Sequence, residues 1–139
     1  MIEFFVGPIH PRPKNSGKVN RRTGRVFDSP TARRCRKELT RLVRRFAPRE
    51  PLSGYLRLEA TFRLPLAKSW SKTKKLKAQL GEIRPANRNT GDVDNLRKLL
   101  QDVLQKAGFF EDDSQIVESE SSKVYAEVPG YWVRITGVA

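Results

Sequence analysis

The chain has 139 residues, of which 37% are hydrophobic and 31% are charged, and this suits one compact domain with little room for a second. A single Cys and a single His exclude an intrachain disulfide and a Cys/His zinc cluster. The apolar runs are far shorter than the roughly 20 residues that cross a bilayer, and the N-terminus lacks the pattern of a secretory signal. We therefore expect a cytoplasmic protein with one domain, residues 1–139, and no membrane partner.

The distribution of charge gives the first indication of function. Lys and Arg outnumber Asp and Glu by 28 to 15, a net charge of +13, which favours a polyanionic partner such as nucleic acid. Residues 1–91 carry 23 basic and 6 acidic side chains, whereas residues 92–139 carry 5 and 9. An acidic tract disfavours binding close to phosphates unless a metal ion reverses the local charge.

The N-terminal segment predicts a strand and then a basic loop. Residues 2–6 are apolar and aromatic and are followed by Gly7-Pro8, as at the end of a strand. Residues 10–25 contain six Lys or Arg and almost nothing to bury. We expect a basic loop there, with a hairpin turn near Gly24 that residues 26–27 close.

A helix follows, with Ser29 as its N-cap and Pro30 in its first turn. Pro48 and Pro51 end it. Its apolar residues recur at helical spacing: Ala32, Cys35, Leu39, Leu42, Val43 and Phe46. Its opposite face is basic: Arg33, Arg34, Arg36, Lys37, Arg41, Arg44 and Arg45.

The middle of the chain predicts one clear strand and one short helix. Apolar and polar residues alternate strictly over residues 56–64, which indicates a strand with one buried face, and Pro65 ends it. Residues 68–88 are basic and weakly apolar, with a short helix over 72–80.

The C-terminal part predicts a second long helix over 95–107, with Asp94 as N-cap and Gly108 as the residue that ends it. Residues 116–126 and 131–138 have strand character and are expected to pair as an antiparallel hairpin. Strands and helices do not alternate regularly, so the sequence favours an α+β domain with a small mixed sheet and two main helices.

The segment that begins at Asp92 has the composition of a metal site. In an extended chain the carboxylates of Asp92 and Asp94 project to the same side, and two such hard oxygen ligands suit Mg²⁺ or Mn²⁺. Lys98 follows Asp94 by one helical turn and could stabilise charge on a phosphate. Asp102 continues the same line.

A purely structural interpretation stays open at this point. Asp94 could be an ordinary helix cap, and its spacing from Lys98 is that of a surface ion pair. Asp112 and Asp113 could form a solvated turn. What favours a site is that these acids occur together in a chain that is otherwise strongly basic.

Other motifs for catalysis or cofactor binding fail. An EF-hand loop that started at Asp92 would have Arg97 where Gly is needed. No phosphate-binding or dinucleotide-binding glycine motif is present, so no small-molecule cofactor is expected. His10 and Cys35 are interpreted as a plain loop residue and a core residue.

The sequence from Gly91 to Ile116, GDVDNLRKLLQDVLQKAGFFEDDSQI, resembles the central signature of the RusA-type Holliday junction resolvases. The matching positions are Asp92, Asp94, Asn95, Lys98, Asp102, Gly108, Asp112 and Asp113. Outside this segment the similarity is looser. It includes the basic stretch from Pro11 to Lys14, the later residues 24–27 and Lys123.

The resemblance implies a RusA-like fold and a Mg²⁺-dependent endonuclease, of a type found in phages and prophages, that acts as a homodimer on branched DNA in recombination and repair. It also implies roles for individual residues. Asp92, Asp94 and Asp113 would bind the metal, and Lys98 would be the catalytic lysine. Supporting residues would be Asn95, Asp102 and Asp112.

Basic side chains are expected to hold the DNA through its phosphates. The candidates are Arg12, Lys14, Lys18, Arg21, Arg22, Arg25, Lys72, Lys74, Lys75 and Lys123. Two alternatives remain: a DNA-binding protein without catalysis, and a less selective nuclease that cuts flaps, forks or single strands.

Overall fold

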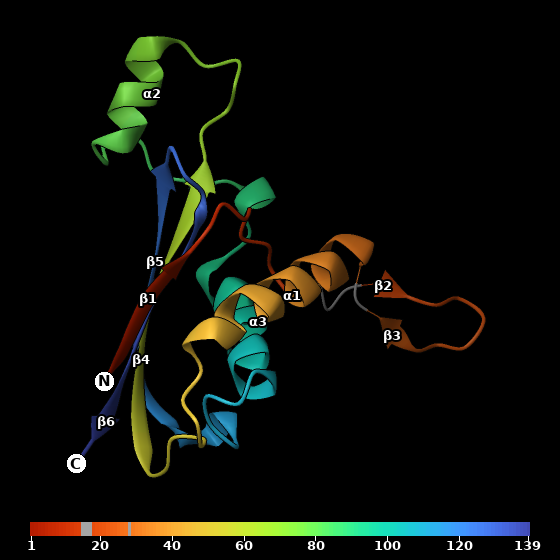
Figure 1. Ribbon diagram of the computed structural model, residues 1–139. Helices are drawn as coiled ribbons and strands as arrows, with labels where there is room; N and C mark the ends of the chain where they lie inside the picture. The colour runs from red at the N-terminus through yellow and green to blue at the C-terminus, as the bar shows by residue number, and fades with distance from the viewer. Residues whose placement is uncertain (15–17, 28) are drawn as a thin grey trace.

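A four-stranded mixed sheet forms the scaffold in the computed structural model, which describes residues 1–14, 18–27 and 29–139. The strands are β1 (Ile2–Val6), β4 (Tyr55–Pro65), β5 (Ile116–Ala126) and β6 (Gly130–Val138), and they lie in the order β1-β6-β4-β5. Only β4 and β5 run parallel. Two long helices, α1 (Pro30–Val43) and α3 (Val93–Lys106), lie on the same face of this sheet (Figure 1), so the predicted α+β class is confirmed.

Strand β4 occupies an inner position and follows the alternation that the sequence predicted. The apolar residues of its alternating stretch, 56–64, are at most 3% exposed and join one continuous core with the buried side chains of the helices. On the other face of β4 the charged side chains are paired. Glu59 accepts hydrogen bonds of 2.7 and 2.9 Å from Arg134 of β6, and Arg57 bridges to Glu118 and Glu120 of β5.

The prediction that the last two strands pair as a hairpin is wrong. β5 and β6 do not pair with each other, because β4 lies between them and bonds to both. Alternation identifies a strand but not its partner. The strand with the most complete apolar face takes the inner position here, where both rows of its backbone groups are satisfied.

Helix α1 (Pro30–Val43) confirms the predicted cap and apolar stripe. The hydroxyl of Ser29 accepts a 3.1 Å hydrogen bond from the N–H of Ala32. A short 3-10 turn, η1 (Arg44–Phe46), extends the helix, and the ring of Phe46 stacks on Phe4 of β1 at 4.8 Å. The helix is thereby fixed to the sheet at its C-terminal end.

Helix α3 (Val93–Lys106) begins earlier than predicted, and its N-cap is Asp92 rather than Asp94. The expectation that these two carboxylates project together from an extended chain is therefore wrong. Asp92 is extended, but Asp94 already lies in the first helical turn. The reason is the preceding turn, which brings Asp92 to the helix in a capping conformation. Gly108 ends the helix with a φ of +90°.

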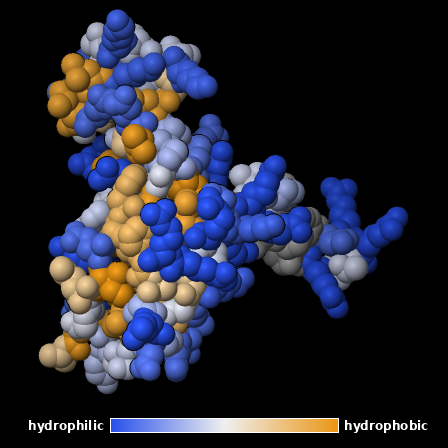
Figure 2. All heavy atoms as spheres, in the orientation of Figure 1, coloured by the Kyte–Doolittle hydropathy of each residue, from blue (hydrophilic) through white to orange (hydrophobic). Residues whose placement is uncertain are grey.

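Two smaller elements project from the body of the protein at different places (Figure 1). The predicted basic hairpin is present as β2 (Lys18–Val19) paired with β3 (Val26–Phe27). Helix α2 (Lys72–Gln79) confirms the short basic helix. Figure 2 shows a hydrophilic hairpin, whereas hydrophobic residues reach the surface on α2. Among the described residues no helix is long and apolar enough to cross a membrane.

Candidate active site along helix α3

A tight turn positions the start of α3. It contains the 3-10 helix η2 (Arg88–Thr90), and the side-chain oxygen of Asn87 accepts a 3.2 Å hydrogen bond from the N–H of Thr90. Gly91 then has φ +77° and ψ 160°, a conformation that is essentially confined to glycine. A Cβ at Gly91 would come within 2.9 Å of the Pro13 side chain. The turn therefore needs glycine both for its backbone and for its close approach to the basic loop.

Asp92 caps α3 with both carboxylate oxygens. One accepts a 2.8 Å hydrogen bond from the N–H of Asn95, and the other accepts a 3.2 Å hydrogen bond from the Asn95 side-chain amide. The side chain is nevertheless exposed. Its negative charge is thus held in a fixed position at the positive end of the helix.

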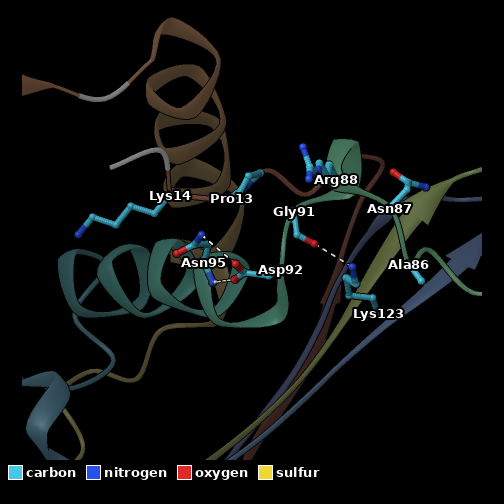
Figure 3. A pocket seen from close by; sticks show the side chains of 9 residues that line it. All are labelled: Pro13, Lys14, Ala86, Asn87, Arg88, Gly91, Asp92, Asn95 and Lys123. Carbon is cyan, nitrogen blue, oxygen red and sulfur yellow. Dashed lines mark hydrogen bonds between the residues drawn. The ribbon is translucent and has the colours of Figure 1, made fainter. Parts of the chain in front are cut away.

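A pocket opens beside Asp92 (Figure 3). It is lined by Pro13, Lys14, Ala86, Asn87, Arg88, Gly91, Asp92, Asn95 and Lys123. Its three cationic residues come from three separate segments: the N-terminal loop, the turn before α3, and β5. Cations around one carboxylate are an arrangement that can receive a phosphate and hold it next to an acidic group.

Lys14 connects this pocket to a second one further along α3. Its backbone N–H donates a 3.0 Å hydrogen bond to the carbonyl of Asn95, and its ammonium lies 2.9 Å from a carboxylate oxygen of Asp102. Two residues earlier, the backbone N–H of Arg12 donates a 3.3 Å hydrogen bond to the buried Tyr131 hydroxyl. Residues 12–14 therefore form a strap along the helix.

The second pocket gathers another group of predicted site residues. Its lining is Lys14, Arg97, Lys98, Gln101, Asp102 and Asp113. Asp113 starts the 3-10 helix η3 (Asp113–Gln115), which directly precedes β5. Lys98 is exposed and faces the same space as Asp113 and Asp102. The two pockets share Lys14, so most of the predicted site lies along one side of α3.

Two of the predicted acids lie outside both of these pockets. Asp94 is 77% exposed and pairs with Arg97 at 3.6 Å, one turn further along the helix. Asp112 caps η3 and accepts a 2.9 Å hydrogen bond from the N–H of Ser114. This backbone hydrogen bond lowers the pKa of Asp112.

The three expected metal ligands are not brought together. Over residues 1–14, 18–27 and 29–139, no three Asp, Glu, His or Cys side chains are grouped so that they could hold a metal ion. Asp92 and Asp113 line different pockets, and Asp94 lines neither of them. The oxygen donors suit Mg²⁺ chemically, but the positions of these side chains do not fit an ion held by all three.

The predicted DNA-binding residues are distributed over three regions: the strap and first pocket described above, the hairpin, and α2. Arg21, Arg22 and Arg25 are exposed on the hairpin, and the side chain of Lys18 lies outside the described part of the chain. On α2, the ammonium of Lys74 lies 4.4 Å from the centre of the Trp70 ring. Lys72 and Lys75 belong to the same helix. These residues form separate basic areas rather than one continuous site.

Arg88 and Asn87 line the first pocket and were not singled out from the sequence. A possible signal was their position directly before the acidic segment, in the turn-rich stretch PANRNTGD. The side chain of Asn87 is held in place, because its amide donates a 3.3 Å hydrogen bond to the Tyr125 hydroxyl. Arg88 is exposed and makes no hydrogen bond or ion pair with a described side chain.

Comparison with known proteins identifies the family of the chain. Residues 8–136 match the family described as endodeoxyribonuclease RusA. A protein of Bacillus subtilis (strain 168), the uncharacterized protein YqaN, is 32% identical over 133 residues, which cover 92% of this chain and 88% of that protein. The matched region contains both pockets and all the acids discussed above.

Proposed function

This chain belongs to the RusA family of endodeoxyribonucleases, and we propose that it cleaves branched DNA, four-way junctions in particular, at the pockets along α3. The observation that carries the proposal is the first pocket, whose lining combines one fixed carboxylate, that of Asp92, with three cationic residues (Figure 3). A protein that only neutralised phosphates would need no negative charge there, because Asn would cap the helix equally well.

The chain's own residues suggest a division of labour. Arg88 would hold a phosphate of the bound strand next to Asp92, because it lines the pocket and is exposed, whereas Lys14, whose ammonium lies on Asp102, would contact the strand between the two pockets. Lys98, in the adjoining pocket, would stabilise the negative charge that develops on the phosphoryl oxygens. The hairpin and α2 would contact the arms of the DNA through phosphates and so contribute little sequence specificity.

We further propose that cleavage needs Mg²⁺, for which Mn²⁺ can substitute, and that the active form is a homodimer with two such sites. A bound divalent ion supplies Lewis acidity and an activated water. The expected ligands Asp92, Asp94 and Asp113 are not assembled in this structure, so the metal requirement stays a prediction.

A second candidate function is DNA binding without catalysis, and one observation favours it. Most of the predicted acids already have a structural partner: Asp92 and Asp112 are caps, Asp94 pairs with Arg97, and Asp102 pairs with Lys14. A protein of this kind would respond to Mg²⁺ only as it responds to added salt.

One experiment separates the two candidates. Wild-type protein and Asp94→Asn are incubated with a labelled four-way junction, a flap substrate, a single strand and a matched linear duplex, each with Mg²⁺ and with EDTA. Paired nicks in the junction alone that need Mg²⁺ and are lost in Asp94→Asn support the proposed nuclease. Cleavage of flaps and single strands at a similar rate would mean a less selective nuclease. Binding without any cut would leave DNA binding as the function.

A further inference from the structure

Lys123 occupies an unusual position for a lysine. It lies on β5 opposite Phe62 of β4, a fully buried residue of the helix-covered face. Its neighbour on that face, Tyr125, is buried as well. A lysine is costly to place next to a core unless its ammonium finds polar partners. Lys123 is half-buried and has such partners.

Its partners belong to the turn before α3. The ammonium donates a 2.8 Å hydrogen bond to the carbonyl of Gly91 and a 3.2 Å hydrogen bond to the hydroxyl of Thr90 (Figure 3). No described carboxylate lies within ion-pairing distance of Lys123. Its hydrogen-bonding capacity is therefore directed at the turn that ends at Asp92.

The same strand holds the other end of this turn. The Tyr125 hydroxyl accepts a hydrogen bond from Asn87, so two adjacent core-facing side chains of β5 hold the turn at its first and last residues. Within the turn the N–H of Gly91 donates to the carbonyl of Arg88 at 3.2 Å. The turn is thus fixed to the sheet and not only to the helix that it begins.

We propose that Lys123 is a positioning residue for Asp92 rather than a phosphate contact. The Gly91 carbonyl that it holds belongs to the peptide bond that leads into Asp92. Fixing that peptide plane fixes the direction in which the capping carboxylate enters the pocket. This inference rests on the proposed function for its effect on cleavage, but its effect on the turn is independent of it.

Arg88 provides a matched control. Both residues line the same pocket, but Arg88 is exposed and unpaired among the described side chains, as a phosphate contact is before DNA arrives. Replacing either residue with Met removes one positive charge from the pocket. Only Lys123→Met also removes the two hydrogen bonds to the turn.

The first experiment uses NMR to measure amide hydrogen-exchange rates of the protein without DNA or metal. In Lys123→Met, exchange of the Gly91 and Asn95 N–H groups should accelerate on the order of tenfold, because the turn and its cap open more often. In Arg88→Met both rates should stay at the wild-type value. Unchanged exchange in Lys123→Met would overturn the positioning role whether or not the protein is a nuclease.

The second measurement compares binding and cleavage of a four-way junction. Lys123→Met should slow single-turnover cleavage about 10- to 100-fold, as the loss of an outer-shell partner does, while its dissociation constant and its salt dependence stay close to wild type. Arg88→Met should bind more weakly, with a slope of log K against log salt that is smaller by about 0.9. A slope reduced in the same way by Lys123→Met would assign it to a phosphate and contradict the proposal.

A second pair of variants covers the case in which Lys123→Met does not fold. Thr90→Val removes one of the two acceptors of Lys123, together with the hydrogen bonds that the Thr90 hydroxyl donates to the carbonyls of Pro85 and Asn87, whereas Thr90→Ser keeps the hydroxyl. The positioning role predicts faster exchange of Gly91 and slower cleavage for Thr90→Val, with the salt slope unchanged, and near wild-type values for Thr90→Ser. Equal behaviour of the two variants would contradict it. If wild type does not cleave while the exchange effects are present, the proposed function fails and the positioning role stands.

Discussion

At the residue scale, Asp92 combines a structural and a chemical role. Its carboxylate caps α3 through Asn95 and at the same time lines the pocket with the cationic residues. Because a cap needs only a short polar side chain that accepts a hydrogen bond, Asn can replace Asp in the first role. It cannot supply the negative charge of the second.

We therefore predict that Asp92→Asn abolishes cleavage but keeps the fold. Its free energy of unfolding should stay near the wild-type value. In Asp92→Ala the free energy of unfolding should fall by about 1 kcal/mol, because the side-chain cap is lost. Junction binding by Asp92→Asn, measured by fluorescence anisotropy, should be preserved or tighter, since a charge that repels phosphate is removed. Weaker binding or loss of folding would count against the assignment.

The ion pair on the open face of the sheet gives a prediction about pH. The hydrogen bond from Arg134 lowers the pKa of Glu59 in the folded protein. The pair therefore stabilises the fold above the pKa of an unfolded Glu, about 4.3, and this stabilisation is lost as the pH falls through the lower folded value. Thermal unfolding between about pH 6 and pH 3 should show a steeper loss of stability for wild type than for Glu59→Gln. Parallel curves would show that the pair does not contribute.

At the element scale, the turn before α3 determines where the helix begins. A cap at Asp92 requires the conformation of Gly91, in which an L side chain is strained and would meet Pro13. The hairpin, in contrast, contributes exposed positive charge through Arg21, Arg22 and Arg25. We therefore expect the turn before α3 to set the geometry of the site and the hairpin to contribute to DNA binding.

Gly91→Ala should lower the free energy of unfolding by about 1–3 kcal/mol and should impair cleavage more than binding. Gly81→Ala is the control, because Gly81 also has a positive φ, +83°, but nothing lies within 4 Å of its added Cβ. Urea unfolding of both variants measures the difference. Equal destabilisation would mean that the contact with Pro13 does not matter.

For the hairpin, we predict that a triple variant, Arg21→Gln, Arg22→Gln and Arg25→Gln, keeps wild-type thermal stability because these side chains are exposed. Its affinity for DNA should fall, and its salt slope should decrease by up to about 0.9 for each phosphate contact that is lost. Anisotropy titrations at several salt concentrations measure both. An unchanged affinity would show that the hairpin does not touch the DNA.

At the scale of the whole molecule, the basic areas project from different places, on the hairpin and on α2 (Figure 1). Such a spread suits a partner with several arms better than a single straight duplex. The proposed homodimer would double the number of arms and present two sites to two strands. The expectation of a homodimer rests on membership of the family.

Sedimentation equilibrium should therefore give twice the mass of one chain, and the same value for Asp92→Asn, which leaves the fold intact. A mass of one chain at every concentration at which the protein cleaves would contradict the homodimer. In that case the paired nicks expected from two linked sites should also become independent single nicks.

The sequence by itself determined most of the elements and singled out the acidic segment that lies along the candidate site. Three patterns were sufficient. The helical spacing from Ala32 to Phe46 and the alternation over 56–64 each indicate an element with one buried face, and the acidic segment after Gly91 places oxygen donors in one short stretch. These patterns are visible in a linear chain because neighbouring residues carry them. The helices α1 and α3, the strand β4 and the family signature were accordingly predicted.

Only the tertiary structure decided how these parts meet. The pairing of β4 with both β5 and β6, and the placement of Lys14 and Lys123 beside Asp92, join residues far apart in the sequence. Local patterns carry no information about such partners, since any strand can bond to any other strand of suitable length. The N-cap likewise moved from Asp94 to Asp92 because the turn, fixed to β5 and the basic loop, selects which of two equally suitable acids begins the helix.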